Sequence, residues 1–237
     1  EVYALKTGEE LRGTKIHVKG HIHNVTYKEQ NYSAGGFAII KFDCEEVISG
    51  ELPKELVERF GEGIAPTVAF AGPTPSLSLR IPYEIRGELI RHERFGWQYK
   101  ILLMVEEIEI KTKDDAEKLF AYILPEVTAR NLVDSLDDPI GVIEKGDIEA
   151  LTQVPGVGPF RARQIIQKYQ DSRENARAYI ELYDYGLTAR MVKRLIEAYH
   201  SPDTLVKKIK ADPYMLIYDV RGIGWTKADQ IALNIGM

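Results

Sequence analysis

Apolar and polar residues alternate over much of the first 110 residues, and this period of two predicts β-strands. The first such run contains Ile16, Val18, Ile22 and Val25 with polar residues between them. Similar runs follow at 37–47, 67–71, 83–92 and 97–110, and Pro and Gly residues separate them. About five strands at this spacing predict a small antiparallel barrel. An OB-like barrel is the first choice, and another small β-barrel stays open as the alternative.

The period becomes helical after residue 110. Asp114 and Asp115 precede a helix expected through 117–122, because acidic residues favour a helix N-terminus. A further short helix is expected at 55–60. The predicted fold class is therefore α+β, with a barrel domain over residues 1–110 and an all-α domain over residues 111–237.

Two segments of the second half contain the same sequence of turn residues. They read Val-Pro-Gly-Val-Gly-Pro at 154–159 and Val-Arg-Gly-Ile-Gly-Trp at 220–225. Small or apolar residues follow at i, i+3, i+4 and i+7, led by Ala162 and Ala228, and two further helices led by Ala129 and Val192 keep this spacing without the glycine pair. The four lead residues are 33, 30 and 36 positions apart, which indicates an internal repeat.

The Gly-x-Gly spacing predicts an anion site. Glycine allows a tight turn between two helices and lets a phosphate approach the backbone. The next helix begins there with unpaired N–H groups and the positive end of its dipole. The apolar middle residue, Val157 or Ile223, is expected to anchor the turn in the core. Such a site contacts a phosphate and no base, so it binds DNA without sequence preference. The alternative is that these glycine-containing hairpins only pack within the protein and bind no ligand.

Composition limits the possible functions. Hydrophobic residues make up 44% of the 237 residues, which is enough for a core. No apolar run approaches the roughly 20 residues of a membrane span, and no secretory signal is recognised, so we expect no membrane partner and a cytoplasmic location. The single cysteine, Cys44, excludes an internal disulfide. Because the chain begins at Glu1 without an initiator Met, we expect it to be a fragment.

The net charge of −5 argues against a globally basic nucleic-acid binder. The first 110 residues carry 13 basic and 17 acidic residues. Basic residues gather locally in the second half: 150–170 contains Arg161, Arg163 and Lys168 and no acidic residue. Residues 186–210 are likewise rich in Lys and Arg. Local positive charge is what a phosphate contact needs.

Some other residues suggest a metal site or base stacking, but their positions in the sequence favour structural roles. His17, His21 and His23 lie close together, but with Cys44 they lack the spacing of a metal site, so pairing histidines and no metal are expected. Base stacking is a possible role for barrel aromatics, although core positions are favoured for each. These aromatics are Tyr27, Tyr32, Phe37, Trp97 and Tyr99. For Trp225, packing beside the hairpin is favoured over contact with a sugar.

Pro-Gly-Val-Gly-Pro followed by Ala-x-x-Ile-Ile, at 155–166, resembles the helix-hairpin-helix motif of DNA repair and recombination proteins. The stretch from Asp212 through 222–232 resembles the amino-terminal region of RecD-like ATP-dependent DNA helicases (exodeoxyribonuclease V alpha subunit), in which an aromatic residue follows the hairpin glycines and an Ala-Asp pair opens the helix. Residues 87–100, with Phe-Gly-Trp-Gln-Tyr, resemble the small β-domain that precedes the repeats in that family. The order of parts matches over nearly the whole chain.

The resemblance implies the accessory front end of a 5′→3′ DNA helicase that acts in DNA repair or recombination. No Gly-x4-Gly-Lys-Ser/Thr string occurs in the sequence, and at 8–15 the Lys and Thr are inverted, so we expect no enzymatic activity in this chain itself. No cofactor is expected here. ATP and Mg would belong to a helicase motor domain expected C-terminal to Met237.

Two other classes of protein stay open. A RuvA-like junction-binding protein also joins an OB barrel to tandem hairpins. A helix-hairpin-helix DNA glycosylase would need a carboxylate downstream of the hairpin, for which Asp171 or Asp184 are the candidates. Neither accounts for both the Phe-Gly-Trp-Gln-Tyr region and the four repeats.

The predicted partner is DNA, bound through its backbone phosphates. No catalytic residue is predicted. The predicted DNA-binding residues are the two Gly-x-Gly turns and the polar or basic residues at the start of the following helices. They are Gly156, Val157, Gly158, Arg161, Arg163, Gly222, Ile223, Gly224, Thr226 and Lys227.

Overall fold

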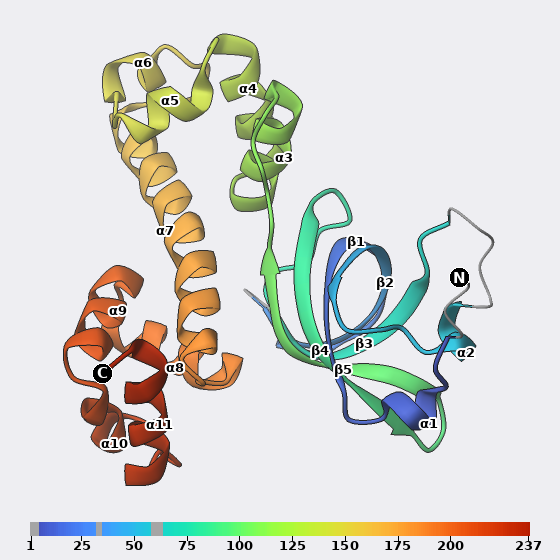
Figure 1. Ribbon diagram of the computed structural model, residues 1–237. Helices are drawn as coiled ribbons and strands as arrows, with labels where there is room; N and C mark the ends of the chain where they lie inside the picture. The colour runs from blue at the N-terminus through green and yellow to red at the C-terminus, as the bar shows by residue number, and fades with distance from the viewer. Residues whose placement is uncertain (1–4, 32–34, 58–63) are drawn as a thin grey trace. The chain divides into compact units, whose positions relative to one another are not determined.

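The computed structural model describes residues 5–31, 35–57 and 64–237 (Figure 1). The predicted α+β class is confirmed: a closed five-stranded barrel precedes a helical region. Tyr32 and residues 58–60 of the expected short helix lie outside the described residues. The described part of that helix is α2 (Lys54–Val57), and a short α1 (Gly8–Leu11) precedes the barrel.

The barrel consists of β1 (Lys15–Lys28), β2 (Gly36–Ser49), β3 (Thr67–Thr74), β4 (Pro82–His92) and β5 (Gly96–Glu106). Its order is β1-β2-β3-β5-β4, and β4 pairs back onto β1 to close it. All neighbouring strands are antiparallel except β3 and β5, which run parallel. Closure leaves no free sheet edge, which protects a small barrel from edge-to-edge association.

The predicted alternation places apolar side chains inside the barrel. Ile16, Val18 and Ile22 are buried, as the period of two requires. Phe70 lies at the centre, with its ring 5.7 Å from the Phe42 ring and 5.2 Å from the Tyr99 ring. Burial also raises the pKa of the Tyr99 hydroxyl. The strand interior is thus an apolar core.

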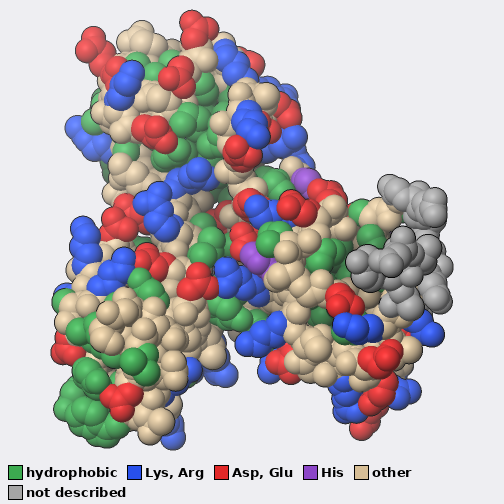
Figure 2. All heavy atoms as spheres, in the orientation of Figure 1, with side chains coloured by type: hydrophobic (Ala, Val, Ile, Leu, Met, Phe, Trp, Pro, Cys, Tyr) green, Lys and Arg blue, Asp and Glu red, His purple; other side chains and the backbone are tan. Residues whose placement is uncertain are grey.

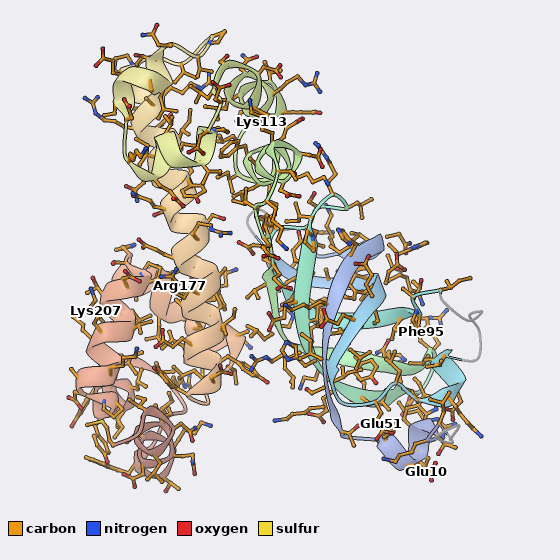
Figure 3. All side chains as sticks on the ribbon, turned by 45° about the horizontal axis from the view of Figure 1, so that its top comes forward. Glu10, Glu51, Phe95, Lys113, Arg177 and Lys207 are labelled. Carbon is orange, nitrogen blue, oxygen red and sulfur yellow. The ribbon has the colours of Figure 1, made fainter. Side chains whose placement is uncertain are left out.

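The helical region begins with α3 (Lys113–Ile123), whose start is labelled at Lys113 in Figure 3. The further helices are α4 (Glu126–Ser135), α5 (Pro139–Glu144), α6 (Ile148–Thr152), α7 (Pro159–Asp184), α8 (Ala189–Tyr199), α9 (Pro202–Ala211), η1 (Pro213–Met215), α10 (Leu216–Asp219) and α11 (Trp225–Ile235). Side-chain oxygens cap many of these helices: Thr112, Asp147 and Thr188 each accept from a backbone N–H three residues on.

The chain forms two compact units: residues 108–177, and residues 1–107 together with 178–237. In the second of these, Leu103 and Val105 of β5 pack with Ala189 of α8. Arg86 of β4 also forms an ion pair with Asp184 at the end of α7, at 2.5 Å. The change from strand to helix falls between Glu106 and Lys113, whereas the division into domains at 110/111 stays a prediction.

Candidate nucleic-acid interface

The first Gly-x-Gly turn joins α6 to α7. Gly156 adopts a left-handed backbone with φ of 77°, a conformation that favours glycine. The Val157 N–H donates to the Val154 carbonyl at 3.0 Å, and both side chains are buried. The Ala162 N–H donates to the Gly158 carbonyl at 2.9 Å, so Gly158 is the residue before the helix and Pro159 opens it. The backbone thus turns at one glycine and begins a helix at the other.

The second turn, between α10 and α11, repeats both of these backbone hydrogen bonds and adds one from the Lys227 N–H to the Gly224 carbonyl at 3.1 Å. Gly222 has φ of 96°, and the Ile223 N–H donates to the Val220 carbonyl at 3.1 Å. The Ala228 N–H donates to the carbonyl of Gly224, the N-cap of α11, at 3.0 Å. Val157 and Ile223 are 5% and 4% exposed, so the apolar residue of each turn anchors it in the core as expected.

Both turns leave room for a ligand at the backbone. No heavy atom lies within 4 Å of where a Cβ on Gly158 or Gly224 would be, and both glycines are exposed. The first N–H groups of an α-helix have no partner within the helix, and no side chain caps α11. These amides and the helix dipole favour an anion.

A third turn, at Gly186, also has a left-handed glycine but lacks the second one, and its hydrogen bonds differ: the Leu187 N–H donates to the Leu182 carbonyl at 3.1 Å. Gly186 has φ of 99°, Leu187 is 1% exposed, and the Val192 N–H donates to the Thr188 carbonyl at 3.0 Å. The Thr188 hydroxyl accepts from the Met191 N–H at 3.3 Å, whereas the equivalent Lys227 N–H donates to the backbone carbonyl of Gly224 at 3.1 Å. This copy is therefore a complete hairpin with a capped helix.

The fourth copy, between α3 and α4, is a different turn. Leu124 and Pro125 connect the helices directly, and the Ala129 N–H donates to the Pro125 carbonyl at 3.0 Å. Leu124 is buried at the position of Val157, but no left-handed glycine precedes it. Packing accounts for the described contacts of this copy.

An asparagine amide supports one turn in each half of the helical region. Asn131 of α4 donates to the carbonyl of Pro155, the residue before Gly156, at 3.2 Å. Asn234 of α11 donates to the carbonyl of Tyr185, the residue before Gly186, at 3.0 Å. Each bond fixes the residue that precedes a left-handed glycine, so the turns are held by neighbouring helices.

The predicted cations lie at the start of the helices. Arg161 and Lys227 occupy the same position, three residues after Gly158 and Gly224, and Arg163 is one position beyond Ala162. All three are exposed, and none forms an ion pair within the described part of the chain. A Cβ built on Gly186 would lie 3.4 Å from the Lys227 Nζ, so this ammonium lies beside the third turn. Thr226 is exposed at the first turn of α11.

The structure adds basic residues that the predicted site omitted. Arg190, Lys193 and Arg194 of α8 are exposed after the Gly186 turn, and Arg221 is exposed in the Gly222 turn. These four side chains also lack an ion partner among the residues described. The local excess of Lys and Arg in 186–210 was visible in the sequence. These basic residues do not follow a Gly-x-Gly turn, because Thr188 stands where the second glycine would be, and the predicted phosphate sites therefore did not include them.

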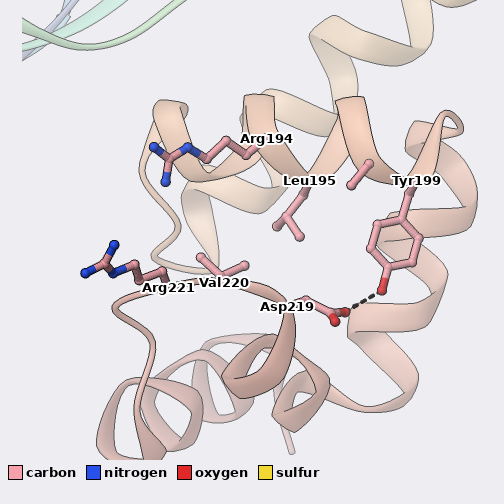
Figure 4. A pocket seen from close by; sticks show the side chains of 7 residues that line it. Arg194, Leu195, Tyr199, Asp219, Val220 and Arg221 are labelled. Atoms are coloured by element: carbon pink, nitrogen blue, oxygen red, sulfur yellow. Dashed lines mark hydrogen bonds between the residues drawn. The ribbon is translucent and has the colours of Figure 1, made fainter.

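A pocket of about 300 Å³ lies next to the second hairpin (Figure 4). Figure 4 shows the Arg194 and Arg221 side chains pointing to the same side, away from Asp219. The Asp219 carboxylate accepts from the Tyr199 hydroxyl and raises the pKa of that hydroxyl. The arginine side of the pocket is therefore cationic. The pocket is lined by Arg194, Leu195, Ala198, Tyr199, Asp219, Val220 and Arg221.

The three histidines of β1 each face a carboxylate. His17 pairs with Glu84 at 2.6 Å, His21 with Glu45 at 2.8 Å, and His23 with Asp43 at 3.2 Å. No group of three or more His, Cys, Asp or Glu that could hold a metal occurs among the residues described. Nor is any helix in the described ranges both long and apolar enough to cross a membrane.

Two family models match the helical region. A model for the helix-hairpin-helix domain of ATP-dependent RecD2 DNA helicases matches residues 171–237, and one for a SAM-like helix-hairpin-helix tandem matches residues 126–171. The five-stranded barrel precedes both. This chain fits the amino-terminal region of RecD2-like helicases. The resemblance drawn from the sequence is confirmed, and helix-hairpin-helix domains of this kind indicate DNA binding.

The two matches meet at residue 171, within α7. The RecD2 helix-hairpin-helix domain contains the turns at Gly186 and Gly222, and the tandem match contains the turn at Gly156. The turn at Leu124 and Pro125 precedes both matches.

A curated protein also shows similarity. The chain is 30% identical over 156 residues to the adenylosuccinate synthetase of Talaromyces marneffei, and the match covers 65% of this chain. It covers 35% of that protein, so the chain spans about a third of the relative's length. The activity in this name is that of the relative.

Proposed function

We propose that this chain is a sequence-independent DNA-binding accessory region of a RecD2-like 5′→3′ DNA helicase that acts in repair or recombination. The observation that carries the proposal is the shared geometry of the turns at Gly156–Gly158 and Gly222–Gly224, which repeat the same hydrogen bonds and both leave the helix start open. Backbone phosphates are held by amides in the first turns of α7 and α11, because the Val157 and Ile223 N–H groups donate within the turns and Pro159 has no N–H.

Local cations strengthen the same sites. Arg161 and Lys227 stand at equivalent positions in the first turn of α7 and α11. Salt limits the reach of exposed charges to about 8–10 Å, so cations within the first turn of a helix act more strongly on a bound phosphate than the net charge of the chain. An amide or a cation contacts phosphate oxygens that every nucleotide carries, so random sequences should bind alike.

The RecD2 domain match supports the helicase assignment over the RuvA-like and glycosylase alternatives. In this proposal, ATP and Mg²⁺ bind a motor domain C-terminal to this region. The described residues of this chain supply affinity for DNA and position it, and the chemistry of ATP hydrolysis belongs to the motor.

The salt dependence of DNA binding tests the phosphate contacts. Each contact contributes about 0.7–0.9 to the log–log slope of affinity against salt. Arg161→Ala combined with Arg163→Ala should therefore lower the slope by about two and weaken binding. A matched control is Lys168→Ala with Arg177→Ala, which removes the same charge from exposed positions on α7. Lys168 lies roughly 14 Å along the helix from its start, beyond the screening length.

An unchanged slope and affinity for the Arg161/Arg163 variant would show that the first turn is not a DNA site. An equal effect of the control pair would show that net charge, and not the hairpin, determines binding. A strong preference among random duplexes of equal length would contradict phosphate-only recognition.

A further inference from the structure

We propose that Trp225 is a base-stacking platform, so that the second hairpin takes single-stranded DNA with an unpaired base on the indole and a neighbouring phosphate at the turn. This inference rests on the proposed phosphate contacts and adds the class of DNA that this turn selects.

The first observation is the exposure of Trp225. The side chain is 65% exposed although it is the first residue of α11 and directly follows Gly224. Figure 2 shows apolar side chains gathered on the surface of the C-terminal helices, where Tyr218 is 83% and Leu233 is 65% exposed. An exposed indole leaves a large apolar face in water, which favours covering that face with another flat apolar surface.

The second observation is that the indole is supported from within the protein. The Tyr214 ring lies 5.8 Å from the Trp225 ring, with 41° between the ring planes. The Tyr214 hydroxyl donates to Asp229 Oδ1 at 2.8 Å, one helical turn beyond Trp225. This hydrogen bond raises the pKa of the Tyr214 hydroxyl. A ring held on one side and open on the other loses little freedom on binding.

The third observation is the charge around the ring. Lys227 and Arg221 flank Trp225 in sequence, are exposed, and have no ion partner within the described ranges. Positive charge beside an exposed aromatic ring is the combination that binds single strands, since cations track the backbone and rings stack the bases. In a duplex the bases are already stacked and paired, so their faces are not free for Trp225.

The first hairpin has an aromatic residue in a similar place. Phe160 is 72% exposed, one position beyond Pro159 at the start of α7. Both intact turns thus present an exposed aromatic side chain within two residues of the second glycine. This recurrence favours a contact with the ligand of the turns.

Indole fluorescence and abasic DNA provide the test. The chain has two tryptophans, so Trp97→Phe makes Trp225 the single indole reporter. The probes are a 15-mer of dT, a 15-mer of abasic sites with the same number of phosphates, and a 15-bp duplex. We expect dT to quench the emission and to bind about tenfold more tightly than the abasic strand, as one stacked base should give.

Variants separate stacking from packing. Trp225→Ala should abolish the difference between dT and abasic DNA, and Trp225→Phe should keep most of it. Leu233→Ala is the matched control, because Leu233 has the same 65% exposure on the same helix. Thermal unfolding of each variant verifies that the fold is intact.

The outcomes distinguish this inference from the proposed function. Equal affinity of the parent for dT and abasic DNA, or unchanged emission at saturating dT, overturns the stacking role but leaves the phosphate contacts standing. A Leu233→Ala effect equal to that of Trp225→Ala also overturns it, since the apolar surface as a whole would then be responsible. If none of the three probes binds, both proposals fail.

Discussion

Gly222 and Gly224 are two residues apart in the second hairpin and have different roles. Gly222 has φ of 96°, in the left-handed region, whereas Gly224 has φ of −101°, which any residue adopts. Gly222 is therefore required for the left-handed backbone of the turn. The second leaves space, because no heavy atom lies within 4 Å of its missing Cβ.

These roles predict opposite effects of the same substitution. Gly222→Ala should lower the free energy of unfolding by about 1–2 kcal/mol, because an L-residue in the left-handed region is strained. Gly224→Ala should leave stability unchanged or raise it by a few tenths of a kcal/mol, yet weaken DNA binding by obstructing the phosphate. Urea unfolding and DNA titration of both variants measure the two effects. Full DNA affinity of a stable Gly224→Ala variant would contradict close approach of a phosphate there.

At the scale of elements, four helical hairpins follow one spacing but fall into different classes. The turns at Gly156 and Gly222 have open helix starts, the turn at Gly186 is capped by Thr188, and the α3–α4 connection is a direct turn at Pro125. What they share is a buried apolar residue before the second helix. Packing therefore maintains the repeat, whereas the turn residues differ from copy to copy.

The Thr188 cap gives an element-scale prediction. Thr188→Ala should lower the free energy of unfolding by about 1 kcal/mol, because the Met191 N–H loses its acceptor. Thr188→Ser keeps the hydroxyl and should be close to the parent. Chemical denaturation of the pair measures the difference. If Thr188→Ser were destabilised as much as Thr188→Ala, the methyl group and not the cap would matter.

At the scale of the whole molecule, the hairpins with open starts belong to different units. Gly156 lies in the unit 108–177, and Gly222 lies in the unit that also contains the barrel. Both units contribute cations without ion partners in the described part of the chain, at Arg161 and Lys227. DNA binding is therefore expected to have two separable contributions.

Additivity of the salt slope tests this separation. Arg161→Ala with Arg163→Ala, and Arg221→Ala with Lys227→Ala, should each lower the slope by about two, and the quadruple variant by about four. Fluorescence anisotropy with one oligonucleotide at several salt concentrations gives the slopes. Loss of all binding on changing either pair alone would indicate that a single site binds the DNA.

Periodicity in the sequence determined much of this protein. The change from a period of two to a helical period located the barrel and the helices. A strand with one buried face repeats its apolar residues every two positions, and a helix with one buried face repeats them about every 3.6 positions. The Gly-x-Gly turns were also evident, since few residues other than glycine adopt a left-handed backbone. The family matches confirm the helix-hairpin-helix assignment in 126–237.

Tertiary structure decided what depends on residues distant in sequence. The parallel pairing of β3 with β5 closes the barrel, and no local pattern encodes a strand's neighbour. Lys227 lies beside the Gly186 turn, and Asn234 of the same helix donates to the Tyr185 carbonyl, although both residues are distant from this turn in sequence. Trp225 is exposed, and not packed away as its apolar character suggested, because Tyr214 covers only part of it. Period and turn residues are local properties, whereas exposure and proximity depend on how the helices pack.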